Sequence, residues 1–388
     1  MQLKKVLLGT TAILGAGLMT LAAPGTVSAQ QVPTVSPGGA LDLTLTGFIR
    51  FRASGGQIDQ AQQNNDLSNG LDFSNDTEFH VVARGKSEEY GFEYGGTIEF
   101  EADTNSTLNT DETWLFLRGG FGEFRFGDDD GVVDDNKIGG ATVAAGTGGI
   151  DGSIIDTTYV ASVGNSVSGL VGPLNSGDAT KIVYYTPDFG GFRAGVSYTP
   201  NSDSNGSNLA SKQQIAQDWV EGALIYEGQF SGVGVQASAV GSGARCTRGQ
   251  INGQNVSTTC SDSGWGQDLY VYGGGAALDL FGVNVAGGYF KSKLGKLEQD
   301  IVNAGVGVGF GPVNTSVTWG YVVDQDGFNY SHPWNLVFSA DVGLAPGLVL
   351  AGDVGYFDND VKCSGCADNS FTGGDKGWQA VARLGLDF

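Results

Sequence analysis

The sequence predicts an all-β fold, a 16-stranded antiparallel barrel that spans a lipid bilayer around a wet interior. Every second residue of the last segment is apolar, from Trp378 to Phe388, while Gln379, Arg383 and Asp387 occupy its other face. This period of two is typical of a strand with water on one side and a hydrophobic medium on the other. About fifteen similar stretches precede it, and no apolar run after residue 30 approaches the ~20 residues of a membrane helix. A closed sheet satisfies every backbone group of such strands in lipid.

The first 29 residues are predicted to be a secretory signal. Basic Lys4 and Lys5 precede an apolar core from Val6 to about Ala23, and residues 27–29, Val-Ser-Ala, form an A-x-A-like cleavage site. The alternative is a membrane anchor that stays in place, but glycine, threonine and Pro24 interrupt the apolar run. The protein is therefore expected to be exported, with residues 30–388 as a single transmembrane barrel domain.

Sixteen segments with two-faced alternation follow one another along the mature chain. In the first of them, Leu43 and Leu45 share one face, and Arg50 and Arg52 share the other. An even number of strands places both chain ends on the same side of the membrane. The predicted strands cover residues 41–52, 76–85, 92–102, 112–120, 122–127, 180–187, 191–200, 218–229, 232–241, 267–280, 282–293, 300–310, 313–324, 333–344, 347–358 and 376–388.

The connections between these strands alternate in length. Short turns are expected at residues 86–91, 119–122, 188–191, 229–232, 280–282, 310–312 and 345–347, and long polar loops include residues 53–75, 128–179, 201–217, 242–266 and 359–375. Short turns at the periplasmic rim and long loops outside are the habit of outer-membrane barrels. A soluble sandwich has no reason to sort its loops in this way.

Charge excludes one class of partner and locates the lumen. The formal net charge is −22, and removing Lys4 and Lys5 with the signal makes it −24, so nucleic acid would be repelled. An arginine that faces lipid costs ~2 to 4 kcal/mol at the midplane, so arginines within strands should line the lumen. Seven arginines lie on polar strand faces: Arg50, Arg52, Arg84, Arg118, Arg125, Arg193 and Arg383. Barrel closure gathers all of these except Arg193 onto one arc of the wall.

An acidic segment follows the fifth strand and begins the third long loop, at about residues 128–179. Its carboxylates are Asp128, Asp129, Asp130, Asp134 and Asp135, and the rest of the loop is rich in glycine, alanine, threonine and valine. Folded into the barrel, such a loop would narrow the lumen and set carboxylates across from the arginine arc, with a transverse field that selects small polar solutes. The alternative is a solvated or calcium-binding hairpin outside the barrel.

Four cysteines remain in the mature chain, and an oxidising compartment makes two disulfides the default expectation. Three pairings are possible; local pairing of Cys246 with Cys260 and of Cys363 with Cys366 is favoured, because each pair lies in one polar segment between strands. The alternative reading of the last pair as a redox or metal motif needs a helix N-terminus or a second ligand pair, and neither is visible. No resident metal is predicted.

The residues do not support an enzyme. Acyl hydrolysis needs a serine, a histidine and an orienting partner, but His80 and His332 are the only histidines and no G-x-S-x-G elbow accompanies them. The glycine-rich string at residues 305–311 is not followed by a helical pattern, so phosphate binding is not expected. No catalytic residue and no cofactor are predicted. An outer-membrane hydrolase remains the alternative from another functional class.

Two segments and the chain end resemble general bacterial porins. Residues 117–127, LRGGFGEFRFG, are similar to the strand-turn-strand that leads into the constriction loop of that family, and residues 181–192, KIVYYTPDFGGF, are similar to the next hairpin. Terminal Phe388 matches the outer-membrane assembly signal. The resemblance, nearest to alphaproteobacterial porins, spans the mature chain, which departs from the family in its cysteines and in a long, glycine-rich third loop.

The resemblance implies a homotrimeric passive diffusion channel in the outer membrane of a Gram-negative cell, in contact with membrane lipid. Lumen arginines would form the basic side of the constriction, and the third-loop aspartates the acidic side. Ions and small hydrophilic solutes would pass through, and the excess of acidic groups favours cations. A substrate-specific channel is the alternative within the same class; it would need a binding site or an aromatic slide, and the sequence shows no run of this kind.

Overall fold

The computed structural model describes residues 34–35, 41–59, 71–103, 109–156, 175–202, 204–206, 216–246, 250–251, 254–255, 264–295, 297–326, 332–358 and 376–388. These residues form a closed antiparallel barrel of 16 long strands, which confirms the predicted fold class. The predicted signal, residues 1–29, lies outside the described residues. So do Cys260, Cys363 and Cys366.

Each of the 16 predicted segments is a strand. Around the barrel they are β2 (Asp42–Asp59), β3 (Leu71–Ser87), β4 (Phe92–Glu101), β5 (Asn109–Gly119), β6 (Gly122–Asp128), β7 (Thr180–Tyr185), β8 (Phe192–Asn201), β9 (Ala216–Phe230), β10 (Val233–Cys246), β13 (Leu269–Leu280), β14 (Val283–Leu294), β15 (Leu297–Phe310), β16 (Val313–Asp326), β17 (Trp334–Ala345), β18 (Leu348–Asp358) and β19 (Lys376–Asp387). Several strands, β2 and β3 above all, extend beyond their predicted ends into the long-loop side, because hairpin pairing continues past the apolar alternation.

The barrel closes where the last strand meets the first. β19 pairs with β2 along its whole length, from Lys376 opposite Asp59 to Asp387 opposite Phe48. Beyond the strand, the N–H of Phe388 donates to the carbonyl oxygen of Gly47 at 3.0 Å, and the N–H of Gly47 donates back to Phe388 at 2.9 Å. The chain end therefore lengthens the closing seam.

Three two-residue strands accompany the barrel. β1 (Thr34–Val35) pairs with the beginning of β2, so the barrel edge at the chain start carries an extra antiparallel partner. β11 (Gln250–Ile251) and β12 (Gln254–Asn255) form a small hairpin of their own between β10 and β13.

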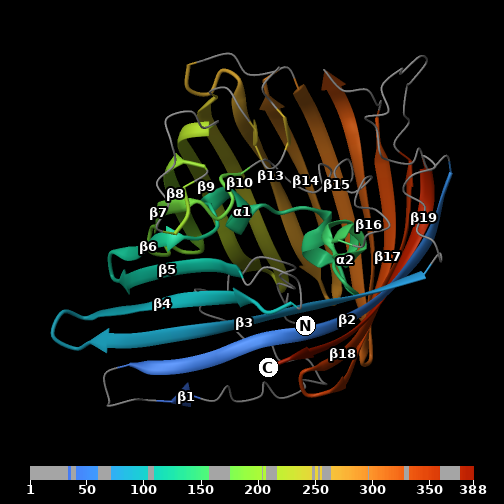
Figure 1. The fold of residues 1–388 in the computed structure, drawn as a ribbon, viewed down its shortest axis with the longest axis horizontal. Coiled ribbons are helices and arrows are strands. Elements are labelled where there is room, and N and C mark those ends of the chain that lie inside the picture. Colours follow the sequence, from blue (N-terminus) through green and yellow to red (C-terminus); the bar gives the residue numbers. More distant parts are fainter. Residues whose placement is uncertain are drawn as a thin grey trace.

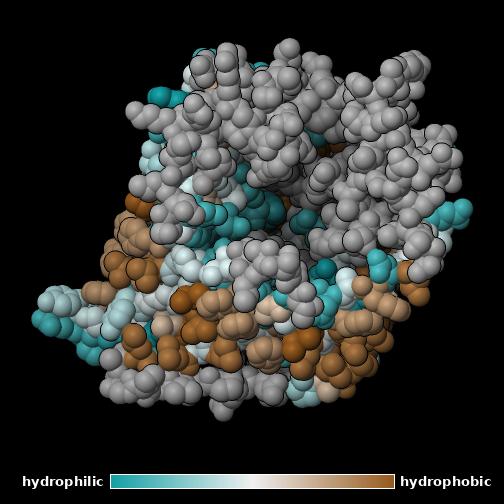
Figure 2. Space-filling view, viewed as in Figure 1, coloured by the Kyte–Doolittle hydropathy of each residue, from teal (hydrophilic) through white to brown (hydrophobic). Residues whose placement is uncertain are grey.

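The barrel is apolar outside and polar inside. Along β19, Gln379 and Arg383 are buried, whereas Trp378 and Leu384 are about half exposed. Figure 2 shows the same sorting: hydrophobic residues form a band on the outer face, and hydrophilic residues surround a recess at the centre. This inversion of a soluble core is the pattern of a barrel with lipid around it and water within.

Short turns join the strands at one end of the barrel. Ser231–Gly232 and Phe281–Gly282 both have positive φ at each of their two residues. Consecutive positive φ values are those of the tight hairpin turn whose twist matches the flanking strands, which explains the X-Gly pairs at these positions.

The third long loop is named L3 here and comprises residues 129–179 between β6 and β7; its described parts, residues 129–156 and 175–179, fold into the barrel as predicted. Its described parts include α1 (Val132–Asn136), the 3₁₀ turns η1 (Gly140–Val143) and η2 (Gly149–Asp151), and α2 (Ser153–Asp156). Figure 1 shows α1 and α2 inside the ring of strands. L3 runs from the β8–β10 wall past β14–β17 to β18 and β19. None of the helices in the described ranges has the length and apolarity needed to cross a bilayer.

The flanking strands explain where L3 enters. β6 has 7 residues and β7 has 6, whereas the next two strands, β8 and β9, have 10 and 15. The barrel wall is therefore short at β6 and β7, and L3 leaves it partway along the length of the neighbouring strands. A loop that begins inside the lumen can satisfy its backbone groups on the polar inner wall.

Candidate functional site

The beginning of L3 is held by a buried arginine of the barrel wall. The guanidinium of Arg125, in β6, donates to Glu123 at 2.7 Å, to Asp135 at 3.2 Å and to Asp129 at 3.4 Å. It also lies 5.1 Å from the ring centroid of Trp114. Arg125 thus contacts the acidic end of L3 directly instead of facing it across the lumen, because β6 leads straight into the loop.

Three acidic residues around the beginning of L3, Asp128, Asp134 and Asp135, have further local partners. Asp135 also accepts a hydrogen bond from the hydroxyl of Tyr185 at 2.7 Å, and the Lys137 ammonium donates to Asp134 at 2.5 Å. Asp128 accepts hydrogen bonds from the Thr180 hydroxyl and, at 2.6 Å, from the N–H of Gly206. These bonds join the two roots of the loop to each other and to β7.

Burial and neighbouring charges shift the pKa values in this segment. Burial, opposed by Arg125, raises the pKa of Asp129 to about 6. Burial would raise the pKa of Asp134 too, but the adjacent Lys137 ammonium outweighs it and holds that pKa below its ordinary value. The pKa of Lys137 is raised in turn, since burial is outweighed by Asp134 and Asp151. The acidic start of L3 is thus a network of strongly interacting charges.

The middle of L3 rests on a glycine-lined stretch of the opposite wall. A Cβ atom on Gly275 or Gly288 would lie 2.0 or 2.5 Å from the carbonyl oxygen of Ile138, and one on Gly305 would lie 2.2 Å from that of Gly140. Real Cβ atoms do not approach this closely, so glycine lets the loop backbone lie flat on β13–β15. The glycine string at residues 305–311, which the sequence left without a role, contributes to this seat.

Polar side chains of β15–β19 fasten the loop to the wall. The N–H groups of Gly140, Ala145 and Ile150 donate to Asn303, Ser316 and Thr318 at 2.7, 2.8 and 3.0 Å. At the far end, Gly146 donates to Asp341 at 2.9 Å, and Thr147 donates to Asp353 through both its N–H, at 3.0 Å, and its hydroxyl.

Five of the six predicted basic residues divide into two groups. Arg383 and Arg52 lie side by side on the inner wall, and Arg50 and Arg52 both pair with Asp76. Arg118 pairs with Glu123 at 2.6 Å, in the same network as Arg125.

Arg84 belongs to neither contact network. It is exposed and lies opposite Asp42 at the short-turn end of the strands. The structure therefore brings Arg50, Arg52 and Arg383 together, brings Arg118 and Arg125 together, and leaves Arg84 apart.

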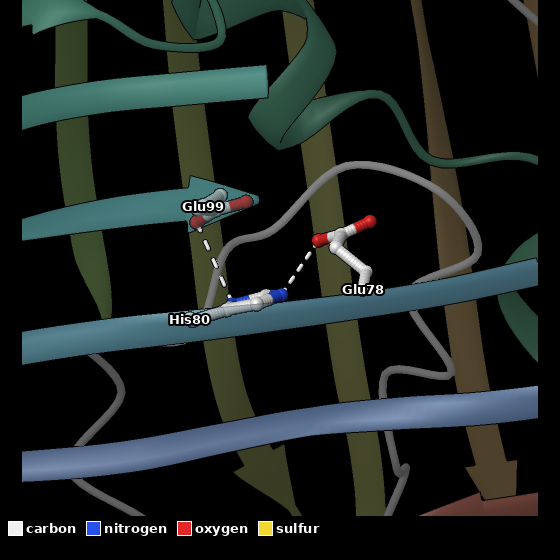
Figure 3. A group of neighbouring side chains, drawn as sticks. All are labelled: Glu78, His80 and Glu99. Atoms are coloured by element: carbon white, nitrogen blue, oxygen red, sulfur yellow. Dashed lines mark ion pairs between the residues drawn. The ribbon is translucent and has the colours of Figure 1, made fainter. Parts of the chain in front are cut away.

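Sequence reasoning missed a carboxylate-rich stretch of the wall on β3–β5. In Figure 3, His80 lies between Glu78, 2.6 Å from its Nε2, and Glu99, 3.7 Å from its Nδ1. Glu101 and Asp111 lie next to Glu78, and Glu112 lies near Asp130 and Asp178. The available signal is the alternation of Glu93, Glu99 and Glu101 with apolar residues along residues 92–101.

The cysteine pairing stays a prediction. Cys246 is buried at the end of β10 and is disulfide-bonded. Its proposed partner, Cys260, and the Cys363–Cys366 pair lie outside the described residues.

These features together define a class. A closed antiparallel barrel with an apolar exterior, a polar interior and a loop folded across that interior is an outer-membrane β-barrel. The sequence profile of the Gram-negative porin family matches residues 10–362, and the chain belongs to this family. An uncharacterized protein of Rickettsia bellii (strain RML369-C) is 26% identical over 148 residues, which are 33% of this chain and 34% of that protein. The chain thus matches about a third of that relative's length.

Solved porin structures share the fold. An anion-selective porin from Comamonas acidovorans superposes with a TM-score of 0.59 at 16% identity, covering 90% of this chain and 100% of that one. Salmonella typhi OmpF, in complex with daunomycin, superposes with a TM-score of 0.57 at 14% identity, covering 92% of this chain and 100% of that one. The trimer form of Vibrio cholerae OmpT superposes with a TM-score of 0.56 at 12% identity, covering 89% of this chain and 100% of that one. At these identities the likeness concerns the fold alone.

Proposed function

We propose that this chain forms a passive outer-membrane channel for ions and small hydrophilic solutes, that L3 is its charged constriction, and that it prefers cations. Family membership and a barrel with a polar interior support a channel, not an enzyme. The observation that carries the constriction is the attachment of L3 at both ends of its path. It is bonded to Arg125 on one wall and to Asp353 on another.

Cation preference rests on the balance of charge along this path. Arg125 forms ion pairs with three carboxylates, Glu123, Asp129 and Asp135. Carboxylates therefore outnumber arginines in this network, and its net charge is negative. The carboxylates of β3–β5 add to it. Arg50, Arg52 and Arg383 supply a smaller basic region around Asp76. A lumen with these proportions attracts cations and repels anions.

The test is the reversal potential of the purified protein in a planar bilayer under a salt gradient. We expect a potential of the sign given by cation passage, and it should shrink at high salt because the charges are screened. A reversal potential of the opposite sign would contradict the proposed preference while leaving the channel itself in place. No conductance at all would contradict the channel.

The homotrimer belongs to the same proposal. The outer wall exposes many apolar side chains, such as Phe73, Leu115 and Phe192, which neighbouring barrels or lipid could cover. Mobility on unboiled gels tests the assembly. A trimer that dissociates on heating is expected, and a monomer in mild detergent would contradict it.

A further inference from the structure

Three carboxylates from separate parts of the chain meet where L3 joins the barrel. Glu112 is in β5, Asp130 follows β6 at the beginning of L3, and Asp178 precedes β7 at its end. One oxygen atom of each lies within 4.8 Å of the others. The cluster therefore brings together the wall and both roots of the loop.

Glu112 gives the cluster an unusual character. Its side chain is completely buried, and within the described part of the chain neither of its carboxylate oxygens accepts a hydrogen bond. A buried carboxylate without partners is costly, because desolvation is not offset by hydrogen bonds or an opposite charge. A side chain placed in this way, with one oxygen within 4.8 Å of an oxygen of each of two aspartates, is suited to a positively charged ligand between the three.

The basic side chains around the cluster are engaged elsewhere. The positive charge of Lys181 acts on Asp178, but the hydrogen bonds of its ammonium group go to the main-chain oxygens of Asp129 and Gly177. Lys137 pairs with Asp134, and Arg125 pairs with carboxylates other than these three. The acidic groups that act on the cluster add further negative charge: Glu99, Asp128, Asp129, Asp134 and Asp135. Among the described residues, no lysine or arginine forms an ion pair with any member of the cluster.

We propose that Glu112, Asp130 and Asp178 bind a calcium ion at the root of L3. Carboxylate oxygens are the ligands that calcium prefers, and it accepts irregular sets of six to eight oxygens. Water or main-chain carbonyls would complete the set. Oxygen atoms that lie within 4.8 Å of one another can all contact one calcium ion at about 2.4 Å. Magnesium demands a nearly ideal octahedral set at about 2.1 Å, which three carboxylates fixed on separate segments of the chain are poorly placed to supply.

Such an ion would tie both ends of L3 to β5. The acidic beginning of the loop would then serve as a calcium site inside the barrel, distinct from the external hairpin that the sequence left as an alternative. Binding does not depend on the proposed transport function, so a calcium measurement tests it separately from any conductance measurement.

The experiment uses the full mature protein, folded in detergent and freed of divalent ions with EDTA, which is then removed. Titration with calcium chloride in a calorimeter should show one saturable site per subunit, with a dissociation constant in the range of about 10⁻⁴ to 10⁻³ M found for extracellular calcium modules. Terbium supplies a second readout. Trp114 is buried two residues after Glu112 on the same face of β5, so it should sensitise the luminescence of terbium bound at the site.

Glu112→Gln and Asp178→Asn should each weaken calcium binding at least about tenfold and abolish most of the terbium signal, because each removes a charged ligand. The matched control is Glu101→Gln, which removes the same charge from β4 in the neighbouring carboxylate group. It should bind calcium like the wild type. Heat-sensitive gel mobility verifies that each variant is folded.

Two results would overturn the proposal. One is a wild-type protein that shows no saturable calcium binding up to about 10⁻² M, tenfold above the expected range. The other is binding that survives Glu112→Gln and Asp178→Asn, or that is lost in Glu101→Gln, which would place the ion elsewhere on the wall. The wild-type titration remains decisive even where a variant does not fold.

Discussion

Arg383 lies directly opposite Arg52 across the seam that closes the barrel. Both side chains are buried on the inner wall, where Arg52 pairs with Asp76 and Arg383 donates to the carbonyl oxygen of Gly146 in L3 at 3.4 Å. Residues that are 331 positions apart in the chain therefore share one basic region beside the far end of L3. The two positive charges add to the positive potential of this region, and the carboxylate of Asp76 neutralises them in part.

Replacing Arg383 by glutamine should make the channel more cation-preferring. The change removes one positive charge from the basic region and leaves the carboxylates of the wall in place, so the ratio of cation to anion permeability should rise by about twofold or more. Reversal potentials under a salt gradient measure it. Arg84→Gln is the matched control, because Arg84 is exposed at the short-turn end and should change the ratio little. An equal effect of both variants would count against a basic region at the seam.

Replacing Asp353 by alanine should loosen the far end of L3. Asp353 accepts hydrogen bonds from the N–H and the hydroxyl of Thr147, and losing a buried acceptor costs about 1 to 3 kcal/mol. We expect noisier single-channel currents and a lower threshold for voltage-induced closure. Glu88→Ala, in an exposed short turn, removes the same charge and should leave the records unchanged. Quiet wild-type-like currents in the Asp353 variant would show that the remaining bonds suffice.

Replacing Gly305 by alanine should push L3 away from the wall. The new methyl group would lie 2.2 Å from the carbonyl oxygen of Gly140, and forcing extra volume into a packed contact costs about 1 to 3 kcal/mol. Single-channel conductance should fall, because the loop is displaced toward the open lumen. In Gly241→Ala the nearest atom would be 3.6 Å away, an ordinary contact, so conductance should be retained. Equal conductance in the two variants would mean that L3 can accommodate a methyl group at position 305 without moving.

Replacing Arg125 by methionine should destabilise the folded barrel. Glu123, Asp129 and Asp135 would lose their shared partner, and removing one side of a buried ion pair typically costs about 3 to 5 kcal/mol. The temperature at which the folded gel band is lost measures the effect. Arg193→Met is the control, since Arg193 is half-buried and lies 5.8 Å from the ring centroid of Tyr185. Similar losses in both variants would argue against a special role for the Arg125 network.

Much of the candidate site could not be located from composition. The five predicted aspartates, Asp128 to Asp130, Asp134 and Asp135, were found as a cluster, but their partners depend on contacts between distant segments, such as Asp135 with Tyr185. Arg125 was expected across the lumen from them and instead lies among them. Glu112 is two residues from Trp114 on an unremarkable strand face, and only the fold shows that both roots of L3 converge on it.

By itself, the sequence determined the strands, their sidedness and the alternation of turns and loops. These follow from local rules, because side chains alternate between the two faces of a strand and only an apolar face can contact lipid. The tertiary structure decided where L3 lies, which charges pair and which carboxylate is left between two others. Those outcomes depend on barrel closure and on the close approach of a loop backbone to glycines of the opposite wall, and both are distances between residues far apart in the chain.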